Sequence, residues 1–143
     1  MKKIDFDNQS DISIDIEDSL EGILSSLSDK SLEVIVVDND TIASINAEYR
    51  GKNAPTDVLS FPLEDIGMGM LGSIVISIDK AIEKSHEFNH SLEDEMKLLF
   101  IHGLLHLLGY DHEVDNGQMR EKEKEIILKY NLPSSLIVRT EEG

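Results

Sequence analysis

The sequence predicts an α+β domain in which helices cover a small mixed β-sheet of about four strands. The clearest strand is Leu32–Val37, an apolar and mostly β-branched run that is typical of a strand buried in a sheet. A long helix is expected after Ser91, and from Leu98 onward it is apolar on nearly every face, which is typical of a buried central helix. Strands and helices alternate at first and helices alone follow, an order that favours the α+β class.

The remaining strands are short. They are expected where apolar residues alternate with polar ones or form brief runs, at Lys2–Asp7, Val58–Phe61 and Leu71–Ile78. Pro62 ends the second of these because proline has no N–H to donate to a sheet.

Helices are expected where apolar residues recur every three or four positions, at about 14–27, 38–49, 80–88, 91–108 and 118–130. The run Asp38-Asn-Asp-Thr offers several N-caps for the second of these helices, and Asp79 can cap the third. Ser91 with Asp94 resembles a capping box at the start of the fourth. We expect Thr140–Gly143 to be a frayed tail.

Composition excludes several classes of protein. The 143 residues fit one domain, 1–143, and the absence of cysteine excludes disulfides and thiolate metal sites. The N-terminus has no apolar run after its lysines, so we expect no signal peptide. The longest apolar stretch, Leu98–Leu108, is too short to span a bilayer, and we therefore expect a soluble cytoplasmic protein without a membrane partner. A formal net charge of −16 argues against general affinity for nucleic acid, so a nucleic-acid role needs a local basic patch or a partner that delivers the substrate.

Three histidines define the candidate metal site. His102 and His106 are four residues apart, so on a helix they lie on the same face, one turn apart. Gly109 can end that helix in a left-handed conformation, and the chain then turns back to bring His112 within reach of the same ion. Three imidazoles with an open fourth position are typical of catalytic zinc, although nickel, copper and iron accept the same ligands. A lone histidine among leucines is usually a core residue, but this spacing favours a metal.

The same spacing occurs in the zinc-peptidase motif His-Glu-x-x-His-x-x-Gly-x-x-His, but Gly103 stands where those enzymes place the glutamate base. The metal ligands are therefore expected without the peptidase base. A second stretch, His86-Glu-Phe-Asn-His90, matches His-Glu-x-x-His literally, with Glu87 as the base. Because it spans an expected junction between helices and has polar neighbours, we interpret it as a wet surface segment.

Arg50 is the candidate anion-binding residue. It begins a loop that also holds Lys52 and several backbone and hydroxyl donors. A guanidinium can hold two oxygens of a phosphate and stabilise the charge that develops on them. An isolated arginine is more often a solvated surface residue, so the surrounding sequence decides between the two interpretations.

Four segments, in chain order, resemble the YbeY family of single-domain, metal-dependent endoribonucleases. They are Asn46-Ala-Glu-Tyr-Arg50, Pro55-Thr-Asp-Val-Leu-Ser-Phe61-Pro, Leu71-Gly-Ser-Ile-Val-Ile and His102–His112, and the similarity runs from about Asn46 to Tyr130. Two positions depart from the family pattern: Ser73, where aspartate is common, and Asp57, where asparagine is often seen. Neither is a predicted metal ligand, and both bear on the detail of the cleft.

The resemblance implies an α+β fold, a metal ion, usually zinc, on His102, His106 and His112, and a functionally required arginine at Arg50. It also implies single-strand-specific cleavage of RNA in the maturation of 16S ribosomal RNA and in ribosome quality control. The partners would then be ribosomal RNA and the small ribosomal subunit, reached through a ribosomal protein.

The leading hypothesis is a metal-dependent hydrolase that cleaves RNA phosphodiester bonds, which the missing peptidase glutamate and Arg50 both favour. Zinc would polarise a phosphoryl oxygen or lower the pKa of bound water, while Arg50 stabilises charge on the phosphate. Asp111 either acts as the general base or orients the neighbouring His112. Two other hypotheses stay open: a ribosome-assembly factor with a mainly structural metal site, and a zinc peptidase that uses Glu87.

Overall fold

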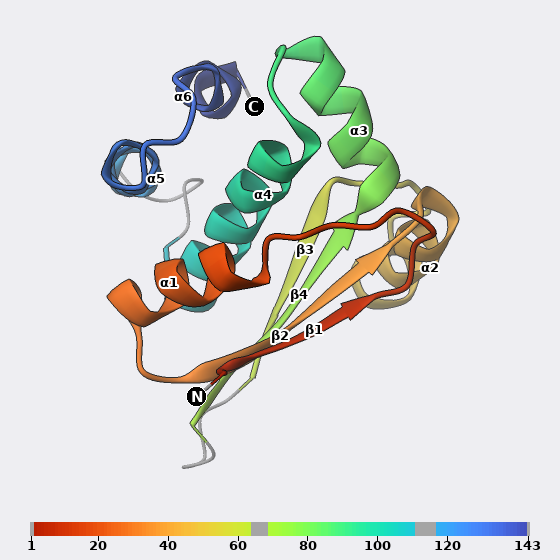
Figure 1. Ribbon diagram of the computed structural model, residues 1–143. Coiled ribbons are helices and arrows are strands. Elements are labelled where there is room, and N and C mark those ends of the chain that lie inside the picture. The colour runs from red at the N-terminus through yellow and green to blue at the C-terminus, as the bar shows by residue number, and fades with distance from the viewer. Residues whose placement is uncertain (1, 64–68, 111–116, 143) are drawn as a thin grey trace.

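The computed structural model describes residues 2–63, 69–110 and 117–142, and its centre is a four-stranded sheet (Figure 1). The strands are β1 (Ile4–Asn8), β2 (Ser31–Val37), β3 (Val58–Pro62) and β4 (Met70–Ser77), in the spatial order β1-β2-β4-β3. β1, β2 and β4 are parallel, and β3 pairs antiparallel with β4 at one edge. The predicted α+β class and small mixed sheet are confirmed.

Six helices lie in the described part of the chain: α1 (Glu17–Leu27), α2 (Asn39–Arg50), α3 (Ile78–Glu87), α4 (Leu92–Leu107), α5 (Gln118–Lys129) and α6 (Ser135–Glu142). α1 and α4 cover one face of the sheet, and α2 covers part of the other. α5 and α6 pack on the side of α4 that faces away from the sheet (Figure 1). No helix among the described residues is both long enough and apolar enough to cross a membrane.

α4 is the buried central helix that the sequence predicts. The hydroxyl of Ser91 caps it by accepting a hydrogen bond from the N–H of Asp94 at 3.1 Å. Between Leu98 and Leu105 every residue is buried except His102. Gly109 follows the helix with a φ of 101°, so the predicted left-handed glycine is confirmed.

The close approach of α4 to the sheet depends on Gly103. A Cβ placed on this glycine would lie 2.8 Å from Cγ2 of Ile74 in β4, closer than carbon atoms can pack. Ser60 of β3 donates its hydroxyl to the carbonyl of Gly103 at 3.3 Å. Gly103 therefore serves tight packing of the helix on the sheet, right beside His102.

The start of α3 differs from the expectation. The helix begins at Ile78, directly after β4, and the hydroxyl of Ser77 caps it by accepting a hydrogen bond from the N–H of Lys80 at 3.1 Å. Asp79 is therefore not the N-cap, because Ser77 already has the extended conformation that a cap requires. The Asp79 carboxylate instead accepts from the N–H of Asn39 at 2.8 Å, at the start of α2.

The C-terminal segment also differs. Residues 140–142, expected to fray, form the last turn of α6. Leu136 of this helix is fully buried in a small apolar cluster with Leu98 of α4 and Ile127 of α5. An eight-residue helix is too short to be stable through its own hydrogen bonds, so these tertiary contacts stabilise it.

We expect Gly103→Ala to lower the free energy of unfolding by about 1–2 kcal/mol, because overpacking against Ile74 exceeds the helix propensity that alanine adds. Gly22→Ala in α1 is the matched control, since a Cβ there meets nothing within 4 Å. That substitution should raise the free energy of unfolding by up to about 1 kcal/mol. Urea denaturation measures both, and stabilisation by both alanines would contradict the tight contact.

Candidate active site

A pocket of about 510 Å³ opens beside the C-terminal end of α4. Arg50 lines it from the end of α2, Thr56 and Asp57 line it from the segment that joins α2 to β3, and His102 and His106 line it from α4. The structure thus brings three of the predicted site residues, Arg50 and the two helical histidines, into one pocket. Asp111 and His112, the other two, lie outside the described residues.

The two imidazoles converge. Nε2 of His102 and Nε2 of His106 are 3.2 Å apart, and the ring planes meet at 76°. Two nitrogens bound to one tetrahedral zinc ion at 2.0–2.1 Å lie about 3.3 Å apart, so this separation suits a shared ion. Within the described ranges no cluster of three or more metal-binding side chains occurs, and the predicted third ligand, His112, falls outside those ranges.

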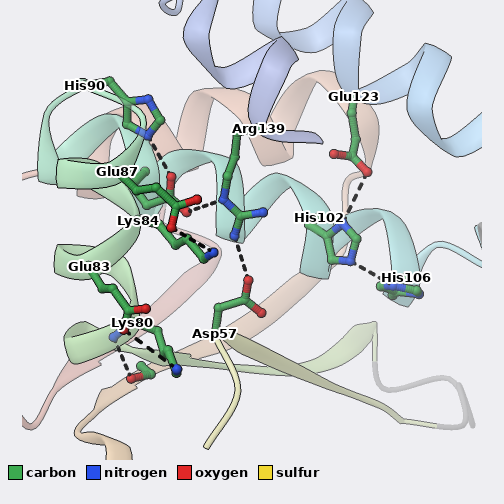
Figure 2. A network of polar contacts seen from close by, with 12 residues as sticks. Asp57, Lys80, Glu83, Lys84, Glu87, His90, His102, His106, Glu123 and Arg139 are labelled. Atoms are coloured by element: carbon green, nitrogen blue, oxygen red, sulfur yellow. Dashed lines mark hydrogen bonds and ion pairs between the residues drawn. The ribbon is translucent and has the colours of Figure 1, made fainter. Parts of the chain in front are cut away.

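Glu123 of α5 supports His102 from the other side of the ring. Its Oε1 lies 3.2 Å from Nδ1 of His102, and its side chain is only 5% exposed (Figure 2). This contact leaves Nε2 turned toward His106. A carboxylate on the second ring nitrogen is the usual support of a metal-binding histidine, because it fixes the tautomer and the ring orientation.

Glu123 was not predicted from the sequence, although a signal was present. Met119, Ile126 and Ile127 form the buried face of α5, and Glu123 lies on that face. A carboxylate at a position where an apolar residue is expected needs a buried partner. Here the partner is the imidazole of His102.

The end of α2 determines the position of Arg50. Gly51 ends the helix with a φ of 71°, and its N–H donates to the carbonyl of Ala47 at 3.1 Å. The buried Asn46 donates from Nδ2 to the carbonyl of Ala54 at 2.9 Å. These bonds hold the loop against α2, so that Arg50 and Thr56 reach the same pocket.

The carboxylate of Asp57 is paired with an arginine from the C-terminal helix. Nη2 of Arg139 lies 2.7 Å from Oδ2 of Asp57 (Figure 2). Nε of Arg139 lies 3.2 Å from Oε2 of Glu95. Burial alone would lower the pKa of Arg139, but the carboxylates of Glu95 and Asp57 outweigh burial and raise this pKa above its ordinary value. The guanidinium is therefore a permanent cation in contact with Asp57, a residue that lines the pocket.

The second histidine pattern is divided between two helices. α3 ends at Glu87, and Asn89 has a φ of 57°, so His86 and His90 do not share a continuous helix, as predicted. The expectation of a wet segment is wrong for His90, whose side chain is 1% exposed. Its Nε2 lies 2.7 Å from Glu95 and its Nδ1 lies 2.9 Å from the hydroxyl of Ser135. The expectation failed because α6, which carries Ser135, was not predicted.

Ser73 is not among the residues that line the pocket. It pairs in register with Glu33 and Phe61, on the face of the sheet opposite α4, and its hydroxyl donates to the Glu33 carboxylate at 2.9 Å. Of the two departures from the family pattern, only Asp57 therefore lies at the pocket.

Comparison with known proteins identifies the family. The sequence profile of the YbeY family, described as endoribonuclease YbeY, matches residues 2–131. The endoribonuclease YbeY of Nautilia profundicola is 58% identical over 97% of this chain and 99% of its own length, and that of Aliarcobacter butzleri is 57% identical over 95% and 98%. A Thermotoga maritima protein solved in solution is 30% identical and matches 97% of this chain and 92% of its own, with a TM-score of 0.63. The chain therefore belongs to the YbeY family of endoribonucleases, as its motifs predicted.

We expect Asn46→Ala to lower the free energy of unfolding by about 1–2 kcal/mol, because it removes the Nδ2 group that donates a hydrogen bond to the carbonyl of Ala54. Amide hydrogen exchange in 51–57 should accelerate more than exchange in the sheet. Asn53→Ala, an exposed asparagine of the same loop, is the matched control and should change neither measurement. Equal effects of the two substitutions would show that Asn46 does not anchor the loop.

Proposed function

We propose that this chain is a zinc-dependent, single-strand-specific endoribonuclease that acts in ribosomal RNA processing and in ribosome quality control. The proposal rests on one observation: Arg50 lines the same pocket as His102 and His106, whose imidazoles converge. Membership of a family of endoribonucleases supports RNA as the substrate.

His102 and His106 would hold the metal through their Nε2 atoms, with His112 as the proposed third ligand. When bound, the ion supplies Lewis-acid polarisation of a phosphoryl oxygen or of the attacking water. Glu123 keeps the ring of His102 in the required orientation through Nδ1. Nickel or another divalent transition metal suits the same imidazoles.

Arg50 binds the oxygens of the scissile phosphate and stabilises the charge that builds up on them. This local cation matters because the whole chain carries a formal net charge of −16 and repels RNA at long range. Asp111 is the proposed general base, or else the residue that orients His112.

The acidity of the chain also favours delivery of the RNA by another molecule. A basic ribosomal protein of the small subunit would attract this surface and hold ribosomal RNA near the pocket. The cytoplasm, where ribosomes assemble, is the corresponding location.

Arg50→Ala should reduce the kcat/KM for cleavage of single-stranded RNA by at least about 100-fold, because it removes the group that stabilises charge on the phosphate. The bound metal should be unchanged. Lys52→Ala is the matched control, since Lys52 is a cation of the same loop but does not line the pocket. Cleavage by purified protein is compared with that of a His102→Ala preparation, which reveals contaminating nuclease. Retained cleavage by Arg50→Ala would remove Arg50 from the mechanism.

Elemental analysis should find about one equivalent of zinc in the purified protein, lost in His102→Ala and kept in His86→Ala. Glu123→Gln should keep the site but weaken metal affinity by about 10–100-fold in a chelator competition, because it weakens the support of His102. Metal that depends on His86 instead would favour the peptidase hypothesis. Stoichiometric metal without any RNA turnover would favour an assembly factor with a structural metal.

A further inference from the structure

We propose that Arg139 is a positioning residue of the pocket, which neutralises and orients Asp57 so that an anionic phosphodiester can enter. The inference rests on the proposed function, because it concerns how that same pocket accepts RNA. Arg139 is not itself among the lining residues, and it acts through Asp57.

Asp57 is the one acidic residue among the described residues that line the pocket. Figure 2 shows its carboxylate turned toward the guanidinium of Arg139, with Oδ2 and Nη2 2.7 Å apart. The Asp57 side chain is 30% exposed and that of Arg139 is 10% exposed. Asp57 thus lines the pocket with a partly exposed side chain, while the more buried Arg139 is not among the lining residues.

An unpaired carboxylate at this position would oppose substrate binding. It would repel the phosphate oxygens, and its charge would offset that of Arg50 in the same pocket. The permanent positive charge of Arg139, which lies closer to Asp57 than to Glu95, offsets much of both effects at short range. The pocket then presents Arg50 and the imidazoles to the phosphate with the opposing charge of Asp57 reduced.

The geometry of the pair is fixed from both ends. Nε of Arg139 contacts Glu95, which is fully buried and also holds His90 at 2.7 Å. A planar guanidinium that bridges two carboxylates through different nitrogens has one orientation. On the other side, the backbone carbonyl of Asp57 accepts from the N–H of Ser77 at 2.9 Å, at the end of β4. Arg139 therefore determines where the Asp57 carboxylate lies relative to α4.

A double-substitution cycle tests this role. The dissociation constant of a fluorescent single-stranded RNA oligonucleotide with a non-cleavable 2′-O-methyl backbone is measured by anisotropy for Arg139→Gln, Asp57→Asn and the double variant. Arg139→Gln should weaken binding by about tenfold at low salt and by about threefold or less at 0.5 M salt, where charges are screened. Adding Asp57→Asn to Arg139→Gln should restore binding to within about threefold of the unsubstituted protein, because the double variant carries the same net charge at this position. The same rescue should appear in kcat/KM for a cleavable RNA.

Lys124→Gln is the matched control, because it removes the same charge from an exposed position of α5 and should shift the dissociation constant less than about twofold. Thermal unfolding is recorded for every variant, since Arg139→Gln leaves Glu95 without its guanidinium. If Arg139→Gln does not fold, the RNA dissociation constant of Asp57→Asn alone tests the proposal. It leaves Arg139 in place and should tighten RNA binding several-fold at low salt, because a negative charge is lost from the pocket.

Two results would overturn the role of Arg139. The first is that folded Arg139→Gln binds RNA as tightly as the unsubstituted protein does, or that its weaker RNA binding is not restored by adding Asp57→Asn. The other is Asp57→Asn that binds RNA no more tightly than the unsubstituted protein. If the unsubstituted protein neither binds nor cleaves RNA, the proposed function fails, and this inference fails with it.

Discussion

The contact between Gly103 and Ile74 is the packing constraint on which the pocket depends. It lets the buried helix α4 lie directly on β4, and the residue before Gly103 is His102. Because α4 is continuous, His106 follows one turn later, while Glu95 near its N-terminal end holds the arginine that pairs with Asp57. One rigid helix therefore positions the imidazoles at one end and the ionic network at the other.

The pocket reconciles an acidic chain with an anionic substrate. The chain has 29 aspartates and glutamates against 13 lysines and arginines, yet in the described part of the chain the acidic residue that lines the pocket and the one that lies behind His102 each have a specific partner. Glu123 contacts His102, and Asp57 contacts Arg139. For binding an anionic substrate, the positions of charges near the pocket therefore matter more than the net charge of the chain. Interactions at hydrogen-bond distance are screened by salt less than the electrostatic field of the whole surface.

Local patterns in the sequence predicted most of the fold and part of the site. The strand Leu32–Val37, the cap at Ser91 and the pair His102 and His106 all follow from spacing within a single helix or strand. The same reasoning could not find contacts between distant segments, such as Glu123 with His102, 21 positions apart. It also missed α6, because an eight-residue helix has too few turns for a clear apolar period and is stabilised by Leu136 in a cluster contributed by other helices.

The 82 positions between Asp57 and Arg139 have a consequence for the order of folding. Closing so long a loop costs chain entropy that contacts already formed around it can offset, so we expect this ion pair to form in the late steps of folding. During synthesis from the N-terminus, the sheet and α4 are complete in sequence before the ribosome has added α6. A nascent chain can thus carry the helical histidines while Asp57 and Glu95 still await their common counter-ion, and the pocket acquires its final charge only with the last helix.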